Sequence, residues 1–337
     1  MTHDTAAEPL HSGYDVALLD LDGVVYIGGK AVPGAPEALR ALAADGMRLA
    51  YVTNNAYRTP SAVAVLLNHL GAPATASDVV TSAQAAARLL ADKLPAGAKV
   101  LVIGGTGLRL AIRERGLVPV SVAAERPQAV VEGYAPGVSY DVLAEGGLAV
   151  AAGAMFVGTN ADSTLPGPHG RQPGNGSMLR VIRHATGAEP VIAGKPEPPL
   201  HRESVLRTGA RHPLVVGDRL DTDIEGAHRV GADSLLVLTG VSRPADLVVA
   251  TPEHRPTYVT AGLQGLLEPY EAAEPADGGF RCGGWVATAG PALTLEGSGD
   301  PVAGLRALCA AAWTNDHLTQ EAAREPLSRL AAAGLPV

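Results

Sequence analysis

The chain of 337 residues is long enough to bury a large core, and its length favours two domains. A formal net charge of −8 without any local basic cluster argues against nucleic acid or an anionic membrane as a partner. With 47% hydrophobic and only 4% aromatic residues, the composition suits buried parallel strands flanked by helices.

The first residues, MTHDTAAEPLHS, carry no sign of a targeting segment. They lack a basic start and an apolar run, and no stretch of the chain is long and apolar enough to span a bilayer. Only two cysteines occur, Cys282 and Cys309, and they do not form a CxxC pair. We therefore expect a cytoplasmic protein with two free thiols and no membrane partner.

Apolar runs alternate with helical patterns in the first part of the chain. A strand is predicted from Val16 to Leu21, a helix over Pro36–Asp45 and a second strand over Leu49–Thr53. Strand, helix and strand at this spacing form a βαβ unit, so the sheet should be parallel. The same pattern returns with strands at Pro213–Gly217 and Ser234–Leu238.

The stretch between these two blocks is predicted to form an inserted α/β domain. Its expected elements are a helix over Ser82–Asp92, strands at Lys99–Ile103, Ala129–Glu132 and Met155–Gly158, a loop over Leu165–Gly176 and a helix from Ser177.

The C-terminal part carries no chemical motif. We expect a linker over Glu271–Gly279, short strands at Trp285–Ala289 and Ala292–Glu296, and a helix from Asp300 to about Trp313. This segment should be an appendage outside the catalytic unit, which covers apolar surface on the core or supports a dimer.

Two aspartates lie at the end of the first predicted strand. Asp20 and Asp22 flank Leu21, and Gly23 lets the chain turn, so each carboxylate can take a separate task. One can accept a phosphoryl group as an acyl phosphate, and the other can protonate the leaving oxygen and later activate water. The motif is weak by itself, because Asp-Gly also marks ordinary turns.

Polar residues also follow the second predicted strand. Thr53, Asn54 and Asn55 offer a hydroxyl, amides and backbone N–H groups that can hold phosphoryl oxygens, although Thr53 could equally cap the next helix. Lys195 lies in the bend Ala-Gly-Lys-Pro, where its ammonium can neutralise carboxylate and phosphoryl charge or simply face solvent.

Three acids, Asp218, Asp221 and Asp223, follow the strand at Pro213–Gly217. Magnesium prefers oxygen ligands, so Asp218 at the strand tip is the expected direct ligand and Asp223 a direct or water-mediated one. Asp221 is expected to cap an exposed helix start. Because ligands of doubly wound sheets lie at the carboxyl ends of the strands, we expect Asp20 and Asp218 to converge.

These four segments, LLDLDG, VTNN, GKP and GDRLDTD, resemble the signature segments of the haloacid dehalogenase superfamily. The resemblance implies that Asp20 is the nucleophile and Asp22 the general acid/base. It further implies that Thr53 binds the transferring phosphoryl group and that Lys195 holds the nucleophile and the phosphate. For the metal it implies a Mg²⁺ held by Asp20, Asp218 and the backbone carbonyl of Asp22, with support from Asp223.

The wording around these motifs is similar to the NagD-like, p-nitrophenylphosphatase-like branch, which carries a large α/β cap between the second and third motifs. It also resembles actinobacterial members proposed to hydrolyse glycerol 3-phosphate. The implied fold class is α/β. A doubly wound, Rossmann-like core (residues 14–81 and 188–268) would carry an inserted α/β cap (82–187) and a small C-terminal α+β appendage (279–337).

The implied function is magnesium-dependent hydrolysis of a small phosphorylated metabolite, glycerol 3-phosphate or 2-phosphoglycolate, with a homodimer left open. A receiver-like phosphoacceptor is an alternative, but it would keep its acyl phosphate and would not need Asp22. A phosphomutase is another, although its cap is usually small and helical. A dehalogenase would need neither Asp22 nor Asp218.

Two glycine-rich segments imitate ligand loops. Val102–Leu110 lacks the third glycine of a dinucleotide loop and is expected to be a tight turn. Pro173–Ser177 lacks the lysine of a nucleotide loop, but the helix that follows could face the substrate. Arg58 and Arg219 flank active-site motifs and are further candidates for substrate contact.

Overall fold

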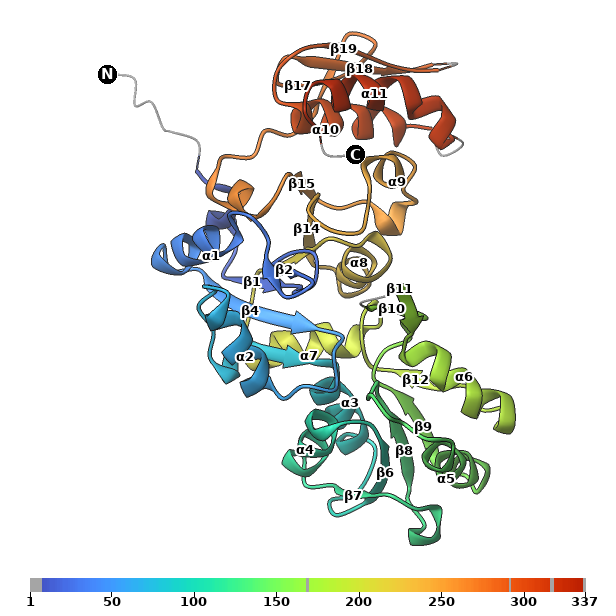
Figure 1. Ribbon diagram of the computed structural model, residues 1–337. Coiled ribbons are helices and arrows are strands. Elements are labelled where there is room, and N and C mark those ends of the chain that lie inside the picture. Colours follow the sequence, from blue (N-terminus) through green and yellow to red (C-terminus); the bar gives the residue numbers. More distant parts are fainter. Residues whose placement is uncertain (1–7, 168–169, 291, 316–317, 336–337) are drawn as a thin grey trace. The chain divides into compact units, whose positions relative to one another are not determined.

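The computed structural model describes residues 8–167, 170–290, 292–315 and 318–335 (Figure 1). The chain divides into two compact units. Unit 1 comprises Met1–Leu49, Leu70–Pro73 and Arg211–Val337, and unit 2 comprises Ala50–His69 and Ala74–Ala210. No helix among the described residues is long and apolar enough to cross a membrane.

Unit 1 contains a parallel sheet in the strand order β15-β14-β13-β1. The strands are β1 (Val16–Leu19), β13 (Pro213–Gly217), β14 (Asp233–Val237) and β15 (Tyr258–Thr260). All four residues of β1 are buried, as expected of a parallel strand covered on both faces. The strands predicted near Val16, Pro213 and Ser234 are therefore present, and they are parallel as expected.

Helices and a small hairpin complete this part of unit 1. They are β2 (Tyr26–Ile27), β3 (Lys30–Ala31), α1 (Ala35–Ala44), α8 (Glu225–Val230) and α9 (Pro244–Val248). A π-helical turn, Leu220–Ile224, connects the end of β13 to α8. Short 3-10 turns lie at Leu10–Gly13, Pro252–His254 and Leu263–Leu267.

The C-terminal module of unit 1 is larger than expected. It consists of β16 (Glu274–Ala276), β17 (Gly279–Cys282), β18 (Trp285–Ala289), β19 (Leu293–Gly297), α10 (Pro301–Ala312), a 3-10 turn (Gln320–Ala323) and α11 (Arg324–Ala332). The four strands form one antiparallel sheet in chain order. The prediction of a linker over Glu271–Gly279 was wrong, because Asp277-Gly278 makes a two-residue hairpin turn between β16 and β17.

This module packs into the core of unit 1. One hydrophobic cluster joins Trp285 and Leu308 of the module to Leu236 of β14 and Leu247 of α9. The Trp313 indole N–H donates to the Leu247 carbonyl at 3.1 Å. The C-terminal segment therefore covers apolar surface of unit 1 and shares its core.

Unit 2 begins with a second parallel strand pair. Its elements are β4 (Arg48–Thr53), α2 (Pro60–His69), β5 (Val79–Thr81), α3 (Ser82–Ala91) and, from a distant segment, α7 (Pro198–Thr208). A 3-10 turn, Ala76–Asp78, precedes β5. β4 and β5 pair in parallel.

A five-stranded parallel sheet forms the rest of unit 2, in the order β12-β9-β8-β6-β7. Its strands are β6 (Lys99–Ile103), β7 (Val118–Val120), β8 (Ala129–Glu132), β9 (Met155–Gly158) and β12 (Val191–Ile192). Its helices are α4 (Thr106–Glu114), α5 (Tyr140–Ala151) and α6 (Asn175–Thr186), with a 3-10 turn at Ala123–Glu125.

A hairpin occupies the place of the predicted loop over Leu165–Gly176. β10 (Thr164–Gly167) pairs with β11 (Gly170–Pro173) in antiparallel register, and α6 begins at Asn175 instead of Ser177. Gly and Pro are compatible with a two-stranded ribbon, because each of its strands has an outer edge that needs no ladder hydrogen bonds. The loop prediction weighed those residues too heavily.

A buried ion cluster holds three helices of unit 2 together. Glu203 of α7 is fully buried and forms ion pairs with Arg88 of α3, with Arg115 at 2.7 Å and with Arg207 at 2.6 Å. Removing one partner from such a buried cluster is destabilising, because it leaves a buried charge without compensation. The cluster thus ties α7 to the α3–α4 side of the predicted cap.

Candidate active site

Three aspartates of unit 1 form an acidic cluster. One carboxylate oxygen from each of Asp20, Asp218 and Asp223 lies within 4.8 Å of the others. Asp218 and Asp223 are buried, at 0% and 1% exposure. Carboxylates that lie this close repel one another unless a proton or a cation is shared between them. The set of hard oxygen donors fits a Mg²⁺ or Ca²⁺ ion.

Strand ends and a helical turn bring the cluster together. Asp20 follows β1 and its backbone N–H donates to the Val216 carbonyl at 2.8 Å, which continues the parallel ladder by one residue. Asp218 follows β13 directly, and Asp223 lies in the π-helical turn after it. The Arg219 backbone N–H donates to Asp223 Oδ2 at 3.2 Å and so orients that carboxylate.

Glycines allow these carboxylates to approach the backbone. Gly23 has φ +87°, and a Cβ there would overlap the Asp218 carboxylate. A Cβ at Gly240 would overlap the same carboxylate, and one at Gly217 would overlap Asp223. Substituting any of these glycines would therefore displace a member of the acidic cluster.

The loop after β14 supports Asp218, and the sequence reasoning missed it. The Val241 N–H donates to Asp218 Oδ2 at 2.6 Å, and the Thr239 hydroxyl donates to the Gly23 carbonyl at 2.5 Å. The Ser242 hydroxyl accepts from the Leu220 N–H at 3.0 Å. The signal that could have revealed this loop is Thr-Gly directly after an apolar strand, the same arrangement that flagged Asp20.

Asp22 is the one predicted metal residue whose carboxylate is outside the acidic cluster. It is exposed and lies in the turn that Gly23 makes, where it forms an isolated bridge with Tyr26. The predicted metal contact of Asp22 runs through its backbone carbonyl, so the prediction does not require its carboxylate to join the acidic cluster.

Arg219 is engaged by Asp221 in a two-bond ion pair, with Nε–Oδ1 at 3.0 Å and Nη2–Oδ2 at 2.8 Å. Burial acts to raise the pKa of Asp221, but the Arg219 guanidinium outweighs it and holds that pKa below its ordinary value. Asp221 therefore binds the Arg219 guanidinium. A substrate contact by Arg219 would have to compete with this ion pair.

In unit 2, the residues after β4 form a tight turn. Thr53 is buried, and its hydroxyl accepts from the Asn55 N–H at 3.1 Å. The Asn55 side chain accepts from the N–H groups of Tyr57 and Arg58 at 2.9 and 3.1 Å. These bonds hold the loop in shape, as side-chain turns of this kind do, and they leave the Asn55 amide nitrogen for other contacts.

Asn54 binds the backbone of Lys195 on both sides. Its Oδ1 accepts from the Lys195 N–H at 2.8 Å, and its Nδ2 donates to the Lys195 carbonyl at 3.2 Å. Lys195 is only 4% exposed, and its ammonium donates to the Val52 carbonyl at 3.5 Å. The Thr53 segment and the Lys195 segment, both predicted to hold the phosphoryl group, are therefore joined directly. The residue that joins them is Asn54, which was expected to bind substrate.

The glycine turn within Val102–Leu110 receives the Tyr57–Arg58 segment. The Gly107 N–H donates to the Tyr57 carbonyl at 3.1 Å, and a Cβ at Gly107 would lie 2.5 Å from the Arg58 carbonyl oxygen. The expectation of a tight turn agrees with this arrangement. Its glycines provide room for the loop that follows the Thr53 motif.

The N-terminus of α6 is occupied by the chain itself. The Gly174 N–H donates to the Ser163 carbonyl and the Gly176 N–H to the Asp162 carbonyl, both at 2.9 Å. A Cβ at Gly174 or Gly176 would overlap those backbone segments. Two N–H groups at this helix N-terminus are therefore already bound by carbonyl groups of the preceding loop, which leaves fewer donors for a substrate.

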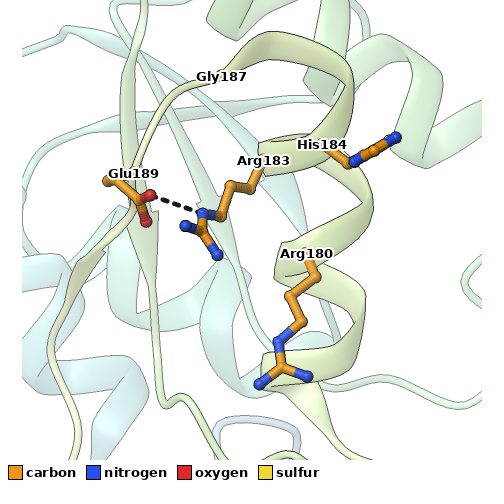
Figure 2. Close-up of a pocket in the computed structure, with 5 residues that line it drawn as sticks. All are labelled: Arg180, Arg183, His184, Gly187 and Glu189. Atoms are coloured by element: carbon orange, nitrogen blue, oxygen red, sulfur yellow. Dashed lines mark hydrogen bonds and ion pairs between the residues drawn. The ribbon is translucent and has the colours of Figure 1, made fainter.

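A hollow of about 500 Å³ lies on the C-terminal half of α6 and contains none of the predicted site residues. Arg180, Arg183, His184, Gly187 and Glu189 line it. Figure 2 shows Arg183 directed at Glu189, with which it pairs at 2.6 Å. We assign no ligand to this exposed surface.

Comparisons with known proteins agree with these motifs. Residues 17–118 match the family model of haloacid dehalogenase-like hydrolases, and residues 192–266 match a second hydrolase-like model of the same kind. Residues 282–335 match a model described as a GCN5-related N-acetyltransferase like domain. The stretches that match the two hydrolase models contain the acidic cluster and Thr53, Asn54 and Lys195.

Relatives extend the match to nearly the whole chain. D-glycerol 3-phosphate phosphatase of Mycobacterium tuberculosis is 44% identical over 89% of this chain and 86% of its own. A crystal structure of glycerol phosphate phosphatase from the same organism, in complex with magnesium, is similar with a TM-score of 0.88 and 42% identity, covering 96% of this chain and 99% of that one. A putative p-nitrophenyl phosphatase of Bacillus subtilis has a TM-score of 0.68 and 36% identity over 75% of this chain and 95% of its own.

These matches confirm the α/β fold class with a cap domain and the p-nitrophenylphosphatase-like resemblance that the motifs indicated. They also confirm that the chain is an enzyme of the hydrolase type. The chain belongs to the haloacid dehalogenase-like hydrolases.

Proposed function

We propose that this enzyme hydrolyses a small phosphate monoester, with glycerol 3-phosphate as the first candidate and 2-phosphoglycolate as the second. The observation that carries the proposal is the acidic cluster of Asp20, Asp218 and Asp223. The choice of glycerol 3-phosphate is supported by the 44% identity of this chain, over 89% of its length, to a D-glycerol 3-phosphate phosphatase.

Asp20 acts as the nucleophile in this proposal. One of its carboxylate oxygens forms a bond to phosphorus while the ester P–O bond breaks, and Asp22 gives its proton to the leaving alkoxide. Asp22 then takes a proton from water, the water oxygen bonds to phosphorus, and the acyl phosphate P–O bond breaks. This step returns the Asp20 carboxylate and releases inorganic phosphate.

Asp20, Asp218 and Asp223 would hold Mg²⁺, with the Asp22 carbonyl as a further oxygen donor. The ion supplies positive charge that screens the nucleophilic carboxylate from the phosphate dianion. Thr53 and Lys195 bind phosphoryl oxygens, and the buried Lys195 ammonium neutralises part of their charge. The relative crystallised with magnesium supports the predicted cofactor.

The partner is a small phosphorylated metabolite. A cap over residues 82–187, which we propose with the boundaries predicted from the sequence, would exclude water and a folded phosphoprotein from the reacting phosphate. A cytoplasmic location stays a prediction, and the two free cysteines are compatible with it.

The test compares kcat/KM for glycerol 3-phosphate, 2-phosphoglycolate, sugar phosphates, pyridoxal phosphate, a 5′-nucleotide and a phosphopeptide with Mg²⁺ present. We expect a three-carbon or two-carbon phosphate to be the best substrate and the phosphopeptide to be the worst. A phosphopeptide as the best substrate would contradict the closed cap. No release of phosphate from any of these compounds would contradict the proposed activity itself.

A further inference from the structure

A chain of asparagine side chains runs through unit 2 from its five-stranded sheet, called the cap sheet below, to Lys195. Asn175, the first residue of α6, donates its amide to the Asn160 carbonyl at 2.8 Å. Asn160, which follows β9, donates its amide to the Asn54 carbonyl at 2.9 Å. Asn54 binds the N–H and the C=O of Lys195. These three residues, Asn175, Asn160 and Asn54, are called the asparagine relay below.

Two members of the relay are buried, and Asn54 is partly buried. Asn175 is 2% exposed and Asn160 is 5% exposed, so water cannot readily replace a lost amide donor. The Asn175 amide also approaches the Glu132 carbonyl at 3.4 Å, so the relay begins on the backbone of β8. Each member thus links the backbone of one segment to the backbone of the next.

The relay also fixes the loop that follows β9. The Asp162 N–H donates to Asn160 Oδ1 at 3.1 Å, and Asp162 Oδ2 accepts from the Asn54 amide at 3.3 Å. Asn160 and Asn54 are therefore joined twice, once directly and once through Asp162. Such a closed ring of hydrogen bonds has one geometry, because every donor has a fixed acceptor.

Close approach of backbone to side chain excludes other arrangements around Lys195. A Cβ at Gly194 would lie 2.5 Å from Asn54 Oδ1 and 2.5 Å from the Thr159 carbonyl oxygen. The residue before Lys195 is thus pressed between Asn54 and the end of β9. A shift of the β9 end must displace Asn54, Lys195 or both.

We propose that Asn160 and Asn175 are positioning residues through which the cap sheet fixes the place of Lys195. The inference rests on the proposed function, in which Lys195 binds phosphoryl oxygens. It adds two positioning residues to the proposed active site, and both lie outside the four signature segments. Neither touches the substrate, and both act through Asn54.

The test is a pair of double-mutant cycles on kcat, with glycerol 3-phosphate as substrate. Asn160→Ala should lower kcat by about 10- to 100-fold, the loss expected when a catalytic group is misplaced by about 1 Å. In the Asn54→Ala background, Asn160→Ala should lower kcat by less than about twofold more, because the link to Lys195 is already cut. Asn175→Ala should follow the same pattern with a smaller loss.

A matched control is Asn68, whose amide bridges the carbonyls of Ala64 and Ala74 at 2.8 and 2.6 Å in α2. Asn68→Ala removes a similar bridge, so it should leave kcat within about twofold of the wild type. Its effect should be the same in the Asn54→Ala background. Thermal unfolding of every variant gives the folded fraction by which each kcat is corrected.

Two results would overturn the relay. Asn160→Ala could retain wild-type kcat in the folded fraction, or its loss could be equally large with and without Asn54. Hydrolysis by the wild type separates this failure from a failure of the proposed function, because an inactive wild type refutes both while an active one isolates the relay.

Discussion

The acidic cluster of unit 1 and the asparagine relay of unit 2 differ in their electrostatics. In the acidic cluster, three carboxylates approach within 4.8 Å, and like charges at that distance are unfavourable without a cation. In the relay, each amide nitrogen donates within the protein, at 2.8–3.4 Å, and only the side-chain oxygen of Asn175 has no partner among the described residues. The first arrangement needs a cation, whereas the second is held by hydrogen bonds between neutral groups of the protein.

This difference assigns different functions to the two regions. A group of charges that repel one another is poised for chemistry, because binding a cation and a phosphate relieves the repulsion. A network of neutral amides that donate to backbone carbonyls is suited to holding backbone in place. Changes in the acidic cluster should therefore affect the rate most, and changes in unit 2 should affect geometry and stability.

The largest effect is expected from Asp20→Asn. The substitution keeps the shape of the side chain but removes the nucleophilic carboxylate, so kcat should fall by about 10³-fold or more. Circular dichroism and thermal unfolding should show a folded protein. A variant that retained more than about a tenth of the wild-type rate would exclude covalent catalysis through Asp20.

Metal removal should sharpen the contrast between the two regions. Chelation should abolish activity and Mg²⁺ should restore it, since the cation is needed between the carboxylates and the phosphate. Without Mg²⁺, Asp218→Asn should be more stable than the wild type, because one of three repelling charges is gone. With saturating Mg²⁺ the order should reverse.

The same comparison in unit 2 gives the control. Asn54→Ala should lower the unfolding temperature by a similar amount with and without Mg²⁺, because the relay needs no cation. Unfolding followed by scanning calorimetry measures both pairs. If Mg²⁺ stabilised wild type and Asp218→Asn equally, the acidic cluster would not be the metal site.

A truncation after Glu268 tests the part of unit 1 that lies outside the acidic cluster. It should lower the free energy of unfolding by at least about 3 kcal/mol, because it uncovers the apolar surface around Leu236 and Leu247. The remaining folded protein should keep magnesium-dependent activity, since no member of the acidic cluster is removed. Complete loss of activity in a folded truncation would give the C-terminal module a catalytic role.

The smallest effect on the rate is expected from Glu132→Gln in the five-stranded sheet of unit 2, where the change should act on stability alone. Glu132 is 1% exposed and neither carboxyl oxygen has a hydrogen-bond partner among the described residues. Burial raises its pKa from the ordinary 4.5 to about 8. The folded protein therefore keeps a proton on Glu132 that the unfolded chain releases above about pH 4.5.

It follows that Glu132 lowers stability as the pH rises from about 4.5 to about 8. The slope is at most about 1.4 kcal/mol per pH unit. Glu132→Gln should remove this dependence, so that the variant equals the wild type near pH 4 and exceeds it near pH 8. Denaturant unfolding at several pH values measures the difference, and parallel curves for the two proteins would show that Glu132 is ionised in the folded state.

The acidic cluster could be predicted from the sequence because its signals are local. Asp20 and Asp218 each follow a short apolar strand, and parallel strands bring their carboxyl ends to one edge. The hairpin turn at Asp277-Gly278 was equally local, and the linker prediction missed it only by giving composition more weight than turn chemistry.

The relay could not be predicted, because its members share no local pattern. Asn160 lies between β9 and β10 and binds a carbonyl more than a hundred positions away in the chain. Single asparagines in loops are common, and only the fold shows which ones are buried between two backbones. The support of Asp218 by Val241 differs, because Thr-Gly after an apolar strand is a local signal for that loop.

The central claim is that Asp20 carries the phosphoryl group, and trapping the phosphorylated enzyme tests it most directly. The enzyme is mixed with ³²P-labelled glycerol 3-phosphate and Mg²⁺, quenched in acid within milliseconds, digested and mapped. We predict that the label lies on the peptide that contains Asp20, is lost on treatment with hydroxylamine and is absent from Asp20→Asn. Multiple turnovers of phosphate release with no label on that peptide at any quench time, or label on another residue, would contradict the claim.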